Sequence, residues 1–161
     1  MILNTKKLSM DLNANMKLFL DTNILIDKLA NRQPFVEDVK ELCVAKFFGD
    51  VELYVSVLSF LEALRVLKKY ATLADLKQRC FDSLNFFEVV EIDQTSLLSA
   101  LQSDCANVEN YMISKSATNV GADYLITRDF EGFRESKVQA ISPKNFIKLL
   151  KDEFNVEYGL V

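Results

Sequence analysis

Histidine and tryptophan are absent from this 161-residue chain, and glycine (4), proline (2) and cysteine (3) are scarce. Without histidine there is no histidine-ligated zinc site and no Ser-His or Cys-His nucleophile pair. The scarcity of glycine and proline in a chain that is 50% hydrophobic argues against disorder and predicts a packed, helix-rich globule. Any catalytic chemistry in this sequence must therefore come from carboxylates.

Cysteine usage and hydropathy indicate the cellular compartment of the chain. Cys43, Cys80 and Cys105 are odd in number and widely spaced, and no Cys-x-x-Cys pair occurs. No stretch has the length and lack of charge of a membrane span, and residues 1–15 contain no apolar core of signal-peptide length. We expect a reduced, cytoplasmic chain with no membrane partner.

The charge balance limits how nucleic acid could bind. The 23 acidic and 19 basic residues give a net charge of -4, so no broad basic surface can grip a duplex by counterion release. Bound divalent cations can still neutralise an acidic cluster and attract phosphate, because they are often the largest local charges. The composition therefore allows a nuclease that binds its substrate locally.

The chain has the length of one domain. We expect residues 1–15 to be a flexible extension or the product of an upstream start codon, and residues 16–161 to form the domain. Short apolar runs alternate with helix-period segments in the order β-α-α-β-α-α-β-α-α-β-β-α. This alternation predicts a parallel sheet covered by helices on both faces. We expect strands at 17–20, 51–56, 86–92, 122–127 and 138–141, and helices from Asn23, from Pro34 toward Phe48, from Leu58, over 73–84, 94–102 and 108–119, and from Pro143.

Four acids lie at predicted strand ends or helix starts, namely Asp21, Glu62, Asp104 and Asp129. Open parallel sheets bind ligands outside the carboxyl ends of their strands, so acids at those ends share one crevice. Asp21 ends the first predicted strand and Asp129 follows the strand at 122–127. Asp123 precedes that strand and should lie on the opposite edge. The arrangement predicts a carboxylate metal site.

Each acid also has a plainer explanation. Asp21 could cap the helix that follows it, and Asp104 could cap a helix beginning directly after it. Glu62 could pair with Arg65 on a solvated helix face. Asp129 could be an ordinary loop acid. The residue types alone do not decide between these roles and a metal site.

Four segments in order, Lys17–Asp27, Ser59–Glu62, Asp104–Tyr111 and Gly121–Asp129, together resemble a PIN domain. The segment Val138–Phe146 is also similar to the last strand and helix of that family. The resemblance implies a three-layer α/β/α sandwich with a five-stranded, mostly parallel sheet. It also implies a Mg²⁺- or Mn²⁺-dependent endoribonuclease like the VapC toxins of toxin-antitoxin pairs, with RNA as substrate, an antitoxin as partner and a homodimer contact.

The resemblance further implies that Asp21, Glu62 and Asp129 are catalytic metal ligands. Relatives often carry acids at the positions of Asp104 and Asn107, and the neutral Asn107 should weaken metal binding here.

We expect Asp104, one helical turn before Asn107 on the same face, to supply the missing carboxylate. Glu109, about 200 degrees round the helix from Asn107, should point away.

Four further residues are predicted to support the metal ligands or to contact substrate: Asn23, Asn107, Thr127 and Arg128. Arg128 is the residue expected to steer the RNA backbone. A catalytically degenerate PIN-like module that binds RNA or protein is the alternative, and Asn107 is its main support. A haloacid-dehalogenase-like phosphatase would need a second aspartate at the position of Asn23, so we set it aside.

Overall fold

The computed structural model describes residues 15–158 and contains a five-stranded sheet in the order β3-β2-β1-β4-β5. Every neighbouring pair of strands is parallel, which confirms the predicted three-layer α/β/α sandwich. The strands are β1 (Met16–Leu20), β2 (Val51–Ser56), β3 (Phe87–Val90), β4 (Tyr124–Ile126) and β5 (Ala140–Ile141).

The helices follow the predicted order. They are α1 (Thr22–Ala30), α2 (Phe35–Phe47), α3 (Val57–Leu67), α4 (Leu73–Ser83), α5 (Gln94–Gln102), α6 (Val108–Asn119) and α7 (Pro143–Phe154). The main differences from prediction are shorter strands, since 86–92 is reduced to β3 and 138–141 to β5. In the part of the chain that the structure describes, no helix is both long and apolar enough to cross a membrane.

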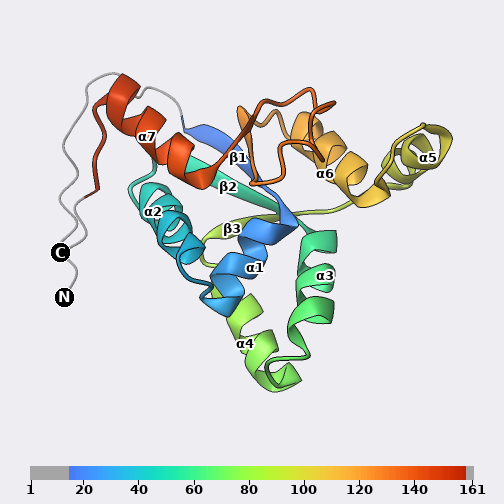
Figure 1. Ribbon diagram of the computed structural model, residues 1–161, viewed down its shortest axis with the longest axis horizontal. Coiled ribbons are helices and arrows are strands. Elements are labelled where there is room, and N and C mark those ends of the chain that lie inside the picture. Colours follow the sequence, from blue (N-terminus) through green and yellow to red (C-terminus); the bar gives the residue numbers. More distant parts are fainter. Residues whose placement is uncertain (1–14, 159–161) are drawn as a thin grey trace.

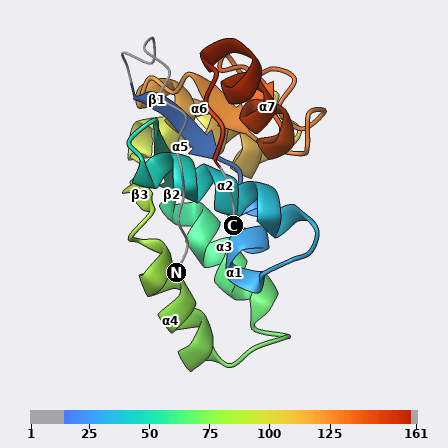
Figure 2. The same ribbon diagram turned by 90° about the vertical axis from the view of Figure 1, so that its left-hand side faces the viewer.

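Two hydrophobic cores of different size lie on the two faces of the sheet. Leu18 and Leu20 of β1 point into the larger core, which also contains residues of α1, α2, α3, α4 and α7. Phe19 between them points into the smaller core with Ile113 and Ala117 of α6. Successive side chains of a strand point to opposite faces, so the fully apolar β1 supplies both cores. The helical layers are visible from two directions (Figure 1, Figure 2).

The register of the sheet shows which residues lie at its amino-terminal edge and which at its carboxyl-terminal edge. Asp123, just before β4, accepts a hydrogen bond from the Lys17 backbone N–H at 2.7 Å, which places it at the amino-terminal edge as expected. Helix α1 begins at Thr22, two residues after the end of β1, and α3 begins directly after Ser56 of β2. The side chain of Ser56 caps α3 by accepting from the Leu58 N–H. Both helices therefore start at the carboxyl-terminal edge.

The expected flexible extension over residues 1–15 falls outside the described residues except for Asn15.

Candidate active site

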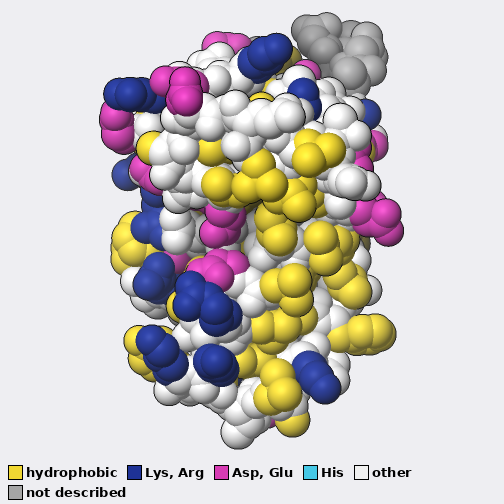
Figure 3. Space-filling model, turned by 90° about the vertical axis from the view of Figure 1, so that its right-hand side faces the viewer, with side chains coloured by type: hydrophobic (Ala, Val, Ile, Leu, Met, Phe, Trp, Pro, Cys, Tyr) yellow, Lys and Arg dark blue, Asp and Glu magenta, His cyan; other side chains and the backbone are white. Residues whose placement is uncertain are grey.

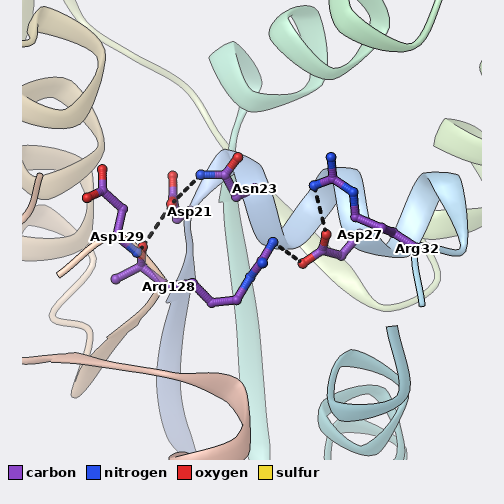
Figure 4. A network of polar contacts seen from close by, with 7 residues as sticks. Asp21, Asn23, Asp27, Arg32, Arg128 and Asp129 are labelled. Carbon is purple, nitrogen blue, oxygen red and sulfur yellow. Dashed lines mark hydrogen bonds and ion pairs between the residues drawn. The ribbon is translucent and has the colours of Figure 1, made fainter. Parts of the chain in front are cut away.

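Asp21 is buried at the carboxyl end of β1, with 3% of its surface exposed. Its backbone is extended and precedes the first turn of α1. The carboxylate oxygen Oδ2 accepts a hydrogen bond from Thr127 Oγ1 at 2.8 Å and a longer one from Asn23 Nδ2 at 3.4 Å. Two of the predicted supporting residues thus fix the orientation of this carboxylate (Figure 4).

Thr127 joins Asp21 to Asp129. Strand β4 pairs with β1, and the Asp21 N–H donates to the Ile126 carbonyl at 3.0 Å. The hydroxyl of Thr127 donates to Asp21 and accepts from the Asp129 backbone N–H at 2.9 Å. The register of two central strands and the Thr127 hydroxyl therefore bring together Asp21 and Asp129, the first and last of the four candidate acids.

The two aspartates form an uncompensated pair of acids. Burial raises the pKa of Asp21, its hydrogen bonds from Thr127, Thr22 and Asn23 lower that pKa, and the nearby Asp129 raises it further. No arginine or lysine among the described residues acts on the Asp21 carboxylate. A buried charge without a partner is costly, so this pair favours a cation bound from solution.

Gly132 makes room for the Asp129 carboxylate. The Gly132 N–H donates to Asp129 Oδ1 at 2.9 Å, and the Gly132 carbonyl accepts from Asn110 Nδ2 at 3.3 Å. A Cβ atom at position 132 would lie 2.1 Å from Asp129 Oδ2 and 2.5 Å from Asn110 Nδ2. Such contacts are impossible without moving the carboxylate. Gly132 was not predicted, because its role depends on space rather than on a sequence pattern.

Glu109 lies close to the pair through Thr22. Thr22 Oγ1 donates to Glu109 Oε1 at 2.8 Å and shares a 2.8 Å hydrogen bond with Ser59 Oγ, which joins α1, α3 and α6. The expectation that Glu109 points away is wrong. The angle of about 200 degrees was counted along a helix from Asn107, but Asn107 is the non-helical N-cap of α6, with a φ of -140°. Helical spacing does not apply across that position.

Glu62 is engaged by a neighbouring base. It lies in α3, where its Oε2 accepts from Arg65 Nε at 2.7 Å and its Oε1 pairs with Arg65 Nη2. This hydrogen bonding lowers the pKa of Glu62. Glu62 and Glu109 both line a groove between α3, α5 and α6.

Asp104 lies apart from this groove. Asp104 does not cap a helix, because α6 begins at Val108, as predicted, and Asn107 caps it by accepting from the Asn110 N–H at 3.0 Å. The expectation that Asp104 lies one helical turn before Asn107 is therefore wrong, since residues 104–107 are not helical. Asp104 is exposed and lines a second groove.

The donor chemistry of the aspartate pair fits a hard divalent cation. Within residues 15–158, no three acidic or cysteine side chains are grouped closely enough to share a metal ion. Mg²⁺ is nevertheless commonly bound by one or two carboxylates together with substrate phosphates and water. Asp21 and Asp129 supply two such carboxylates, and Glu109 is the next acid joined to them by hydrogen bonds.

Arg128 anchors the loop that carries Asp129. Its Nη2 pairs with Asp27 Oδ2 of α1 at 2.7 Å, while Arg32 Nη1 pairs with Asp27 Oδ1 at 3.4 Å (Figure 4). The guanidinium carbon lies 3.7 Å from the centre of the Phe35 ring. Burial raises the pKa of Asp27, and the two arginines oppose that shift. Arg128, which was expected to steer the RNA backbone, is therefore paired with the buried Asp27 carboxylate.

A groove of about 690 Å³ lies beside Glu62 and Glu109 and is mainly apolar. We call it the apolar groove. Figure 3 shows hydrophobic side chains gathered along this side of the molecule, next to a group of Lys and Arg side chains. The groove is lined by residues of α3, α5 and α6 and of the segment before α5: Val57, Leu58, Leu61, Glu62, Arg65, Ile92, Asp93, Gln94, Leu97, Val108, Glu109 and Met112. Leu61 of α3 is 61% exposed and belongs to this apolar surface.

The chain belongs to the PIN domain family, because the family model described as PIN domain matches residues 17–131. No curated protein matches the sequence.

Solved structures share its fold. A toxin-antitoxin complex from Klebsiella pneumoniae is 23% identical with a TM-score of 0.57, covering 78% of this chain and 97% of that chain. DNA-bound VapBC from Salmonella typhimurium is 14% identical with a TM-score of 0.61, covering 80% and 98%. PAE2754 from Pyrobaculum aerophilum is 16% identical with a TM-score of 0.61, covering 85% and 91%.

Proposed function

We propose that this protein is a metal-dependent endoribonuclease that acts in the cytoplasm as the toxin of a toxin-antitoxin pair. The observation that carries the proposal is the Asp21–Asp129 pair, aligned by Thr127 at the carboxyl edge of a PIN-domain sheet. In open α/β sheets this edge is where ligands bind. Two carboxylates with no basic residue acting on Asp21 are suited to a cation and a phosphodiester.

Asp21 and Asp129 would hold Mg²⁺ or Mn²⁺ through their carboxylate oxygens. The ion would supply stabilisation of charge on the phosphate and a lowered pKa for the attacking water. Thr127 and Asn23 keep the Asp21 carboxylate in one orientation. Hydrolysis would form a bond from the water oxygen to phosphorus and break one P–O ester bond. A carboxylate of the pair would accept the proton that the water loses, and the leaving oxygen would take up a proton from solvent.

The metal-binding roles of Glu62 and Asp104 stay predictions, and Glu109 joins them as a candidate. Glu109 accepts a hydrogen bond from Thr22, which directly follows Asp21, whereas Asp104 lies in the second groove. Of the three, Glu109 has the most direct connection to the aspartate pair. For Arg128, we propose a positioning role in place of the predicted contact with RNA.

The apolar groove supports the proposal that this protein binds protein partners. Exposed leucines on α3 and α5 and a valine on α6 present apolar surface that no other part of the described chain covers. Large exposed apolar patches commonly mark protein interaction sites. One solved structure with this fold is described as a toxin-antitoxin complex, and others are structures of VapBC. We propose that an antitoxin and a second copy of the chain are the partners.

The direct test is cleavage of a structured RNA in the presence of Mn²⁺. The intact protein and the Asp152→Asn control, altered at an exposed site on α7, should cleave. The Asp21→Asn variant and a chelated sample should not. Cleavage that persists in both would refute a carboxylate metal site.

The alternative is a PIN-domain protein that binds RNA or protein without cleaving it. Asn107 in place of an acid favours it, as does the absence of a three-acid group within residues 15–158. The two proposals differ in one observable, since the binder would have no activity for Asp21→Asn to remove.

A further inference from the structure

The second groove, about 520 Å³ in volume, lies between one face of α6 and the segment 131–137. We call it the polar groove. From α6 it is lined by Asn110, Tyr111, Ser114, Lys115 and Thr118, which recur at helical spacing, and Asn107 lines it from the position before the helix. Of the fifteen residues that line the groove, six carry an amide or a hydroxyl and six are charged, in contrast to the mainly apolar lining of the apolar groove.

The polar groove begins beside Asp129. Gly132 and Asn110 line its wall; the Gly132 N–H donates to the Asp129 carboxylate at 2.9 Å, and the Gly132 carbonyl accepts from Asn110 Nδ2 at 3.3 Å. A phosphodiester held at the aspartate pair would thus place the next part of its strand at the mouth of this groove.

Two of the polar groups in the groove that make no hydrogen bond within residues 15–158 suit recognition of a base. These are the hydroxyl of Tyr111, which is half-buried, and the amide nitrogen of Asn107, whose Oδ1 already caps α6. An amide can bond to the edge of a base, and an aromatic ring can stack on its face.

The charges of the groove argue against phosphate as its occupant. Three acids face three bases along its lining, and Arg134 is already paired with Glu131 at 2.8 Å. A groove that is close to neutral and rich in amides and hydroxyls suits a neutral nucleobase. An apolar protein segment would find more complementary surface in the apolar groove.

We propose that the polar groove binds one unpaired nucleobase of the RNA strand, stacked on Tyr111 and read at its edge by Asn107. The inference rests on the proposed function, since it takes the phosphate to lie at Asp21 and Asp129. Bases in an A-form duplex are not accessible in this way, so the substrate is single-stranded at the cleavage site. The groove gives the protein a base preference next to the scissile bond.

The test is binding of fluorescently labelled single-stranded RNA to the Asp21→Asn protein, followed by anisotropy. Adding Tyr111→Leu should weaken binding about fivefold or more, the lower bound for loss of one stacked base. Tyr111→Phe keeps the ring and should bind within about twofold of the parent. Tyr70→Leu makes the same change at a site 81% exposed, in the turn after α3, and should have no effect.

A second variant does not depend on the stability of Tyr111→Leu. Asn107→Ser keeps an N-cap side chain but removes the amide, so α6 stays capped. It should reduce the difference in affinity between the four homopolymer RNAs. Equal affinities for the parent, Tyr111→Leu and Asn107→Ser would overturn the base pocket even if the intact protein cleaves RNA. Binding that depends on Tyr111 without any cleavage would retain the pocket and refute the nuclease. Absence of both binding and cleavage would refute both.

Discussion

The Asp21 carboxylate destabilises the folded chain in the absence of a cation, because it is buried beside Asp129. Replacing it with asparagine keeps an oxygen that can accept from Thr127 and Asn23 while removing the charge. We expect Asp21→Asn to raise the free energy of unfolding at pH 7 on the order of 1 kcal/mol, while activity falls more than about 100-fold. Denaturant unfolding and RNA cleavage assays measure the two effects separately.

The increase in unfolding free energy on Asp21→Asn should become smaller as the pH is lowered. Burial and Asp129 raise the folded-state pKa of Asp21 above its ordinary value of 3.8, so the folded state holds the proton more tightly than the unfolded state. The stability penalty is therefore complete above the raised pKa and disappears below 3.8. The difference between Asp21→Asn and the unmodified protein should shrink as pH falls through this window. Cleavage by the unmodified protein should decline over the same range. A stability difference that is constant with pH would contradict this account.

Mn²⁺ provides an independent readout for the same residue. A cation that binds only the folded state raises the melting temperature by mass action. The increase should occur in the unmodified protein and in Asp152→Asn, and it should be lost in Asp21→Asn. An equal increase in all three would place the metal elsewhere.

Gly132→Ala should impair activity more than stability. Its Cβ would displace the Asp129 carboxylate, and a misplacement of about 1 Å can cost about 100-fold in rate. Gly49→Ala is the matched control, because nothing lies within 4 Å of its Cβ but its φ is +78°. That variant should lose about 1 kcal/mol of stability and keep its activity. Equal losses of activity in the two variants would argue against the proposed role of Gly132.

At the scale of elements, the Asp27–Arg128 pair ties the loop after β4 to α1. Removing one partner leaves the other charge without its main counter-ion, and Asp27 is almost fully buried. We expect Arg128→Met to cost about 3 kcal/mol of unfolding free energy. The double variant with Asp27→Asn should cost clearly less than the sum of the two single changes, which a double-mutant cycle in denaturant would measure. Additive losses would show that the pair is not coupled.

The start of α6 shows what element-level prediction misses. The sequence places a helix over 108–119 correctly, because apolar periodicity is a strong signal over that length. It does not reveal which polar residue caps the helix, since both Asp104 and Asn107 are good caps. The choice of Asn107 decides that Glu109 turns toward Thr22, and it leaves Asp104 in a loop. The position of the cap, rather than the extent of the helix, therefore decided where the two acids lie.

At the scale of the molecule, the topology was predictable and the contacts of the site were not. The order of elements follows from local alternation of apolar runs, and a parallel sheet follows from that order. The proximity of Asp21 and Asp129 also follows, because both lie at carboxyl ends of strands. The pairings of Arg128 with Asp27 and of Gly132 with Asp129 depend on side-chain packing between distant segments, which carries no periodic signal.

The apolar groove makes the free chain prone to association. Leu61 of α3, which lines the groove, is 61% exposed, and Leu101 of α5 is 65% exposed. We expect the protein to sediment as a dimer in the absence of an antitoxin. Leu61→Lys and Leu101→Lys should each shift it toward the monomer with unfolding free energy changed by less than about 0.5 kcal/mol, as is usual for surface changes. A monomer at all concentrations, unaffected by either change, would rule out this contact.

The loop segment 127–132 contains four of the residues that form or position the candidate site. Within it lie the hydroxyl that bridges the two aspartates, the arginine that fastens the loop, one of the aspartates and the glycine that gives it space. Only Asp129 among these would hold the metal, and none of them belongs to a strand or helix. Changes confined to this loop could therefore erase the chemistry while the whole sandwich persists. A PIN domain of this design can pass from enzyme to binding protein without passing through an unstable fold.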